Sequence, residues 1–109
     1  MYGIEVRHSD NGSVEIGLRG EFDLTSEEEL RETLSRVASL RRTTTIDLSR
    51  VTFMDLQSTR ELAVRSQLYA HHVTLINPSW QVKRSVKACK LGKWVRFESR
   101  VEKPLQKVS

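Results

Sequence analysis

Near the middle of this 109-residue chain runs Ile46-Asp47-Leu48-Ser49-Arg50-Val51-Thr52-Phe53-Met54-Asp55, the segment from which its fold can be read. Together with Thr44, Ile46 and Leu48 alternate with polar residues, which is typical of a strand with one buried face. Asp55 then precedes a run of helix-forming residues, and an aspartate in that place caps a helix. The segment therefore predicts a strand that leads into a helix, and residues 52–54 either extend the strand or belong to the loop.

Downstream of Asp55, helices and strands alternate. A helix fits residues 56–71, and the apolar run 73–76, ended by Asn77-Pro78, predicts a strand. A third helix is predicted over 79–90, with Val82, Val86 and Cys89 on one side, and a last strand over 94–97.

Upstream, the chain opens with a predicted hairpin. Asn11-Gly12 supplies the positive φ that a tight hairpin turn requires. Apolar residues alternate with polar ones on both sides of this turn: Tyr2, Ile4 and Val6 before it, and Val14, Ile16 and Leu18 after it.

The first helix is predicted over residues 25–40. Thr25 or Ser26 is expected to cap it, with Glu28 or Glu29 completing a capping box. Apolar side chains recur along one face of this helix, which should pack on the core: Leu30, Leu34, Val37 and Leu40.

These elements follow the order β-β-α-β-α-β-α-β, which indicates an α/β fold. Strands that alternate with helices favour a parallel sheet with crossover helices, and the opening hairpin makes the sheet mixed, with four to five strands. Residues 1–98 are expected to form one domain, and residues 99–109 a polar, flexible tail.

Composition is that of a soluble globular protein, with 38% apolar and 29% charged residues. No apolar run approaches the roughly 18 residues that cross a membrane, and the N-terminus lacks the pattern of a secretory signal. The only cysteine, Cys89, has no internal disulfide partner. Together these features favour a cytoplasmic location.

No catalytic, cofactor or metal site stands out. His71 and His72 are adjacent and cannot face one ion as an i, i+4 pair could. Asp23, Asp47 and Asp55 could pair as acid and base, but Asp23 and Asp55 each lie where a helix begins, and capping is the simpler explanation for them. The chain is therefore expected to bind another protein without catalysing a reaction.

Charge is unevenly spread along the chain. Residues 1–78 carry more acidic than basic side chains, whereas residues 79–109 are strongly basic and contain every lysine. Such asymmetry indicates an acidic partner, nucleic acid, or simply a solvated helix face. A nucleic-acid site is the less favoured alternative, because no aromatic platform is interleaved with the basic side chains Lys83, Arg84, Lys87, Lys90, Lys93 and Arg96.

Three segments together resemble the STAS domain of bacterial anti-sigma factor antagonists: Gly20-Glu21-Phe22-Asp23-Leu24-Thr25, the segment from Ile46 to Asp55, and the segment from Asn77-Pro78-Ser79 to Leu91-Gly92. The resemblance spans about residues 3–97. In that family two hydroxyl residues and a glycine follow the aspartate at the start of the second helix. The resemblance implies that an anti-sigma factor, itself a kinase, phosphorylates the second hydroxyl, and the added charge blocks binding.

The sequence departs from the family at this switch. Leu56 takes the place of the first hydroxyl residue, Gln57 that of the phosphoacceptor, and Ser58 that of the glycine. A register slip would bring Ser58 or Thr59 into the role, but hydroxyls one residue away point about 100° elsewhere on a helix. We interpret Gln57 as a lost switch that leaves partner binding constitutive.

The expected partner is an anti-sigma factor or a related regulatory protein with an ATPase fold. It would bind at the N-terminus of the second helix and the neighbouring loops, including Asp23, Asp55, Leu56, Ser58 and Thr59. In the alternative, the fold is the same but the binding partner is a transporter complex or a signalling scaffold. The sequence does not indicate an oligomeric state.

Helical phase makes a further prediction for the second helix. One side should face the sheet, and it carries Thr59, Leu62, Ala63, Ser66, Tyr69 and Ala70. The opposite side should be exposed to solvent, yet it contains two apolar residues. We expect this side to bind the partner: Gln57, Arg60, Glu61, Val64 and Leu68.

Overall fold

The computed structural model describes residues 1–100 and shows a five-stranded sheet in the order β1-β2-β3-β4-β5, with three helices. The mixed α/β architecture predicted from the sequence is confirmed. Its elements in chain order are β1 (Tyr2–His8), β2 (Val14–Phe22), α1 (Glu27–Ser39), β3 (Thr44–Met54), α2 (Leu56–Leu68), β4 (Val73–Ile76), α3 (Trp80–Ala88) and β5 (Phe97–Glu98).

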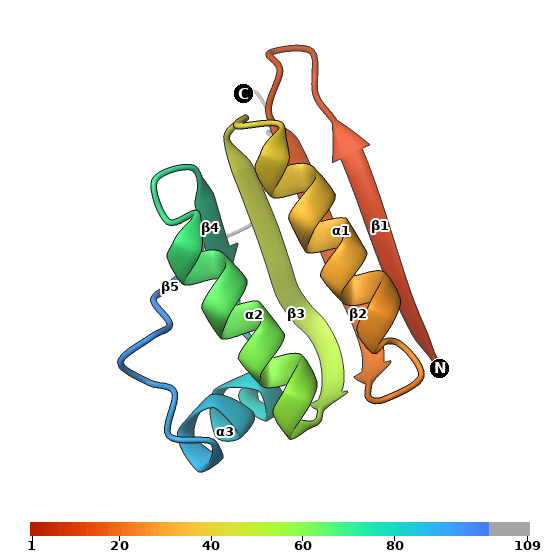
Figure 1. Cartoon of the computed structure of the whole chain (residues 1–109), viewed down its shortest axis with the longest axis vertical. Coiled ribbons are helices and arrows are strands. Elements are labelled where there is room, and N and C mark those ends of the chain that lie inside the picture. The colour runs from red at the N-terminus through yellow and green to blue at the C-terminus, as the bar shows by residue number, and fades with distance from the viewer. Residues whose placement is uncertain (101–109) are drawn as a thin grey trace, which may run out of the picture.

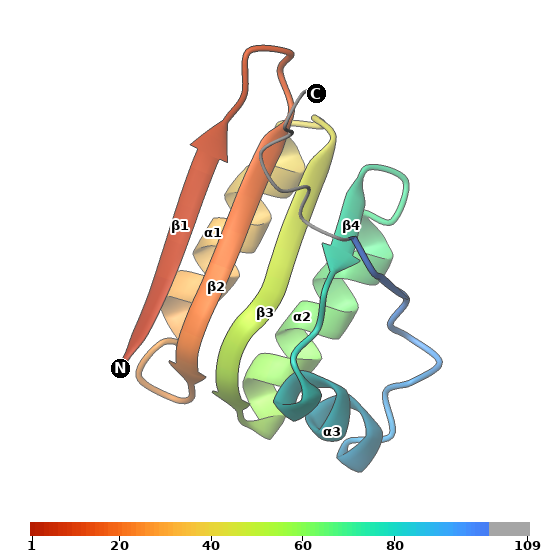
Figure 2. The ribbon, with the colours of Figure 1, turned by 180° about the vertical axis from the view of Figure 1, so that it is seen from behind.

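Only the β1–β2 pair is antiparallel in this sheet, and the three other strand pairs are parallel. Helices α1 and α2 lie side by side on one face of the sheet (Figure 1). Seen from behind, the other face carries no helix over β1 and β2, and α3 lies at the end of the sheet where β3 finishes (Figure 2). No helix among residues 1–100 combines the length and apolarity needed to cross a bilayer.

The core lies between the sheet and α1 and α2. The alternation in β2 buries Val14, Ile16 and Leu18, and β3 contributes Ile46 and Leu48 in the same way. The register between β2 and β3 then shifts twice, between Gly17 and Arg19 and again between Gly20 and Glu21, so that Val51 and Met54 also point inward. Residues 52–54 thus extend the strand, which settles the alternative that the sequence left open.

The predicted boundaries of all three helices and of the last strand were wrong, because these elements end earlier or begin later than expected; α3, predicted over 79–90, spans only Trp80–Ala88. Helix α1 ends at Ser39, and Leu40 is 45% exposed instead of packing on the core. Helix α2 ends at Leu68, which leaves Ala70 exposed. The last strand is only Phe97–Glu98, because the Trp94 backbone N–H donates to the Leu91 carbonyl in a turn. From residue 101 onward, the predicted tail lies outside the described residues.

The predicted capping box at α1 was also wrong. Ser26 occupies the N-cap position, but its backbone is already helical and its side chain makes no cap hydrogen bond. Its hydroxyl instead turns back to the Asp23 backbone, accepting from the N–H at 3.0 Å and donating to the carbonyl oxygen at 3.1 Å. The three acidic residues in the first turn still complement the positive end of the helix dipole.

Gly20 allows β2 to pass the N-terminus of β1. Its φ is +87°, and a Cβ there would overlap the carbonyl oxygen of Met1.

We predict that Gly20→Ala lowers the free energy of unfolding by at least about 1–2 kcal/mol, the cost of a left-handed L-residue. Gly17, in the same strand, has open space where a Cβ would lie. Gly17→Ala is the control and should leave stability unchanged or raise it by up to about 1 kcal/mol. Urea unfolding compares the two, and equal losses would contradict the assignment.

Candidate functional site

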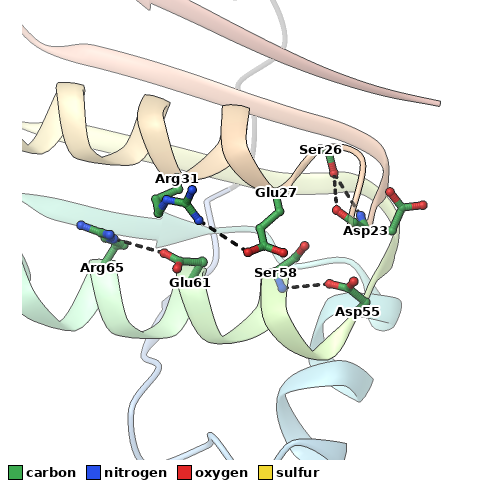
Figure 3. A network of polar contacts seen from close by, with 8 residues as sticks. All are labelled: Asp23, Ser26, Glu27, Arg31, Asp55, Ser58, Glu61 and Arg65. Carbon is green, nitrogen blue, oxygen red and sulfur yellow. Dashed lines mark hydrogen bonds and ion pairs between the residues drawn. The ribbon is translucent and has the colours of Figure 1, made fainter.

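The site predicted from the sequence lies where the parallel strands β2 and β3 end. Phe22 and Met54 are register partners, and the Asp55 backbone N–H donates to the Phe22 carbonyl oxygen at 3.0 Å. Because each strand is followed at once by an aspartate, Asp23 and Asp55 lie on neighbouring turns at the same edge of the sheet (Figure 3).

Asp55 caps α2, as predicted. Its backbone is extended and its carboxylate accepts from the Ser58 backbone N–H at 2.8 Å. Its carbonyl oxygen accepts from the Thr59 N–H at 2.9 Å and the Thr59 hydroxyl at 2.6 Å. One residue thus ends β3 and orients the positive end of the α2 dipole toward solvent.

Asp23 shapes the loop before α1 instead of capping the helix. Its carboxylate accepts from the Thr25 hydroxyl at 2.7 Å and from the Thr25 backbone N–H at 2.9 Å. These two hydrogen bonds, the one from the hydroxyl first, hold the pKa of Asp23 below its ordinary value. The carboxylate is therefore charged at neutral pH, and this loop weakens only as pH falls through that lowered pKa.

The three residues at the switch differ sharply in accessibility. Gln57 is exposed, whereas Ser58 and Thr59 each expose 0% of their surface. The Thr59 hydroxyl is engaged by the Asp55 carbonyl, and the buried Ser58 hydroxyl has no partner among the described residues. A kinase would reach only position 57 without opening the first turn of α2, and the side chain there has no hydroxyl.

Three exposed apolar side chains surround this turn. Leu24 is 79% exposed after β2, Phe53 is 48% exposed at the end of β3, and Leu56 is 50% exposed at the start of α2. We call these three residues the carboxyl rim. Sequence analysis included Leu56 in the site but missed Leu24 and Phe53. Alternation could not have found Phe53, because buried Val51 two residues earlier would place it inward, and a shift of register between these two residues turns it outward.

The side of α2 that was predicted to bind the partner is exposed over most of its length. We call it the α2 stripe: Gln57, Arg60, Glu61, Val64 and Leu68. Val64 and Leu68 are 47% and 61% exposed, and Arg60 is exposed as well. Glu61 is the exception, because it is half-buried and accepts from the Arg65 Nε at 3.2 Å. A parallel ion pair, Arg31 to Glu27 at 3.5 Å, lies on α1 next to it (Figure 3).

Nothing in the described residues resembles a metal centre. No group of three or more His, Cys, Asp or Glu side chains in residues 1–100 is arranged to hold an ion. The rings of His71 and His72 lie 4.3 Å apart, and His72 Nε2 is 3.1 Å from the Ala38 carbonyl oxygen. His72 therefore ties the end of α1 to the turn before β4.

Sequence comparison agrees with this architecture, because residues 4–103 match the model of the STAS domain. The chain belongs to the STAS domain family. No curated protein sequence matches it.

Solved STAS structures share the fold at low sequence identity. An anti-sigma factor antagonist from Mycobacterium paratuberculosis has a TM-score of 0.74 and 19% identity, over 89% of this chain and 85% of that one. The anti-sigma factor antagonist SpoIIAA of Bacillus, in its unphosphorylated form, has a TM-score of 0.70 and 23% identity, over 92% and 90%. SLC26A9 has a TM-score of 0.61 and 18% identity, over 74% of this chain and only 16% of that one.

The cap at Asp55 gives a direct stability test of the site. Asp55→Ala is expected to lower the free energy of unfolding by about 0.5–2 kcal/mol, because it leaves the Ser58 N–H without its acceptor. Asp55→Asn keeps a side-chain oxygen there and should lower the free energy of unfolding by only about a few tenths of a kcal/mol. Urea denaturation followed by circular dichroism measures both variants. If Asp55→Ala is as stable as the parent chain, the cap does not hold the turn.

Proposed function

We propose that this protein is a non-catalytic regulator that binds an anti-sigma factor of the kinase-like ATPase fold. The contact surface is the first turn of α2 together with the carboxyl rim. The supporting observation is that exposed Gln57 stands among three exposed apolar side chains, at the helix end where the family carries its switch. The likeness to anti-sigma factor antagonists supports this class of partner.

The rim has the composition of a binding surface. Leu24, Phe53 and Leu56 provide an apolar centre, and Asp23 and Arg60 provide polar groups at its border. Interfaces commonly combine such a centre with a polar border. Full burial of one Leu or Phe side chain contributes about 1.5–3 kcal/mol, so covering these half-exposed groups would supply a useful part of the binding free energy.

Gln57 makes the binding constitutive in this proposal. SpoIIAA has been solved in both unphosphorylated and phosphorylated forms. A phosphate adds about −1.5 to −2 charge, which would disrupt an interface with an apolar centre. Gln57 keeps a neutral polar side chain at this position, and the burial of Ser58 and Thr59 removes the neighbouring hydroxyls as substitutes.

A second candidate function involves a different binding partner for the same fold. SLC26A9 contains a region of the same fold that covers 16% of its chain. This likeness favours an alternative in which the chain serves a transporter complex or a signalling scaffold. The identity of the partner distinguishes the two proposals.

The test of the proposed function starts from the tagged chain, expressed in its own cells and purified with its partner. Mass spectrometry should identify an anti-sigma factor with an ATPase fold. With that purified partner, Gln57→Glu should weaken binding at least about tenfold, or 1.4 kcal/mol, because it places a charge in the interface.

Thr43→Glu is the matched control, since it adds the same charge at an exposed position at the other end of the sheet. Isothermal titration calorimetry should find its affinity unchanged. A transport ATPase or channel as the specific partner would favour the second candidate. Equal affinities of the parent chain and Gln57→Glu would remove the first turn of α2 from the interface.

The α2 stripe generates a separate prediction. Val64→Lys combined with Leu68→Lys should leave the protein folded, because both side chains are already about half exposed. The doubly substituted chain should lose partner affinity by more than about tenfold if the stripe is buried in the complex. Circular dichroism checks the fold and calorimetry the affinity. Binding at the parent affinity would show that the stripe is bare surface and that the interface ends at the carboxyl rim.

A further inference from the structure

The surface beside α3 has a charge distribution that the proposed function does not use. Residues 79–97 contain no acidic residue and six basic ones. Four of the lysines line one open hollow, namely Lys83, Lys87, Lys90 and Lys93. None of these four forms an ion pair with a carboxylate in residues 1–100, and Glu98, the nearest acidic residue in sequence, pairs with Arg100 at 3.2 Å.

The floor of the hollow is apolar. Val86, from the buried side of α3, and half-buried Phe97, from β5, both line it. The lysine stems add further apolar surface while their ammonium groups reach solvent. The hollow therefore combines an apolar base with cationic walls, which suits a ligand that carries an apolar group between negative charges.

Lys90 is held in a conformation that costs stability. It has a φ of +58°, the left-handed region that favours glycine. The helix ends here with two backbone hydrogen bonds, from the Lys90 N–H to the Lys87 carbonyl and from the Leu91 N–H to the Val86 carbonyl. Arg41 takes the same conformation directly after α1, with a φ of +55°, so this backbone state follows from the way both helices end. Glycine at this position would end the helix with less strain, but it would remove the ammonium group of Lys90 from the hollow.

We propose that the hollow formed by α3 and β5 is a docking site for an acidic peptide segment, one in which carboxylates flank a hydrophobic side chain. The ammonium groups of Lys83, Lys87, Lys90 and Lys93 pair with the carboxylates, and the hydrophobic side chain covers Val86 and Phe97. This site is distinct from the carboxyl rim and does not depend on the proposed function.

The observations favour a peptide over a nucleic acid. Single-stranded nucleic acids are held by aromatic side chains on which bases stack, arranged along a basic groove. Here the lysines surround a floor with a single aromatic side chain, Phe97, instead of a row of aromatic side chains along a groove.

The probe is a synthetic peptide with three glutamates on each side of Leu-Phe. Two reference probes carry the same charge: the same peptide with Gly-Gly in place of Leu-Phe, and a short oligothymidylate. Neither Trp80 nor Trp94 lines the hollow, so isothermal titration calorimetry measures the binding of each probe. The Leu-Phe peptide is expected to bind at least about tenfold more tightly than the Gly-Gly peptide.

The decisive variant is Lys90→Gly. It should raise the urea midpoint, because it relieves the positive φ, and it should weaken binding of the Leu-Phe peptide severalfold. Lys87→Gln combined with Lys90→Gly should weaken it by more than about tenfold. Arg42→Gln combined with Arg50→Gln removes two exposed cations elsewhere and should leave the affinity unchanged.

Three results would overturn the proposal. The Gly-Gly peptide binding as tightly as the Leu-Phe peptide would show that the floor is not used. Tighter binding of the oligothymidylate would assign the surface to nucleic acid instead. An affinity that Lys90→Gly leaves unchanged, with the urea midpoint raised, would mean that the strained lysine has no part in the site.

Discussion

The hydrogen bond from the Asp55 backbone N–H to the Phe22 carbonyl oxygen is the contact on which the candidate site depends. It joins the ends of β2 and β3 at the residue whose carboxylate also caps α2. The helix therefore has to begin one residue after the strand, and its first turn projects from the edge of the sheet beside the Asp23 loop. Exposure of Gln57 and burial of Ser58 and Thr59 both follow from this geometry, because an α-helix turns about 100° per residue.

The sequence predicted this part of the structure well because each signal there was local. Alternation placed Ile46 and Leu48 in the core, and the cap at Asp55 required only the aspartate and the helix after it. Prediction failed where tertiary contacts compete with local preference. Ser26 is a good N-cap residue, but its hydroxyl is taken by the Asp23 backbone, and Leu40 fits the helical stripe although α1 has already ended.

The site was only partly predictable for a related reason. Gln57 and the α2 stripe could be placed from helical phase, whereas the carboxyl rim brings together residues from the loop after β2, the end of β3 and the start of α2. The basic residues near α3 were visible in the sequence as a run of charge. What the sequence could not show is that four of those lysines converge on a floor made by Val86 and Phe97, because β5 reaches that place only through the fold.

We propose that the contact surface of this STAS protein carries no phosphorylation switch, and its affinity for the proposed anti-sigma factor partner tests this. Calorimetry measures that affinity after incubation of the two proteins with or without ATP. The chain should keep its mass, and the separated chain should bind fresh partner equally tightly in both cases. A gain of one phosphate on Ser58 or Thr59, together with a loss of affinity, would contradict the proposal.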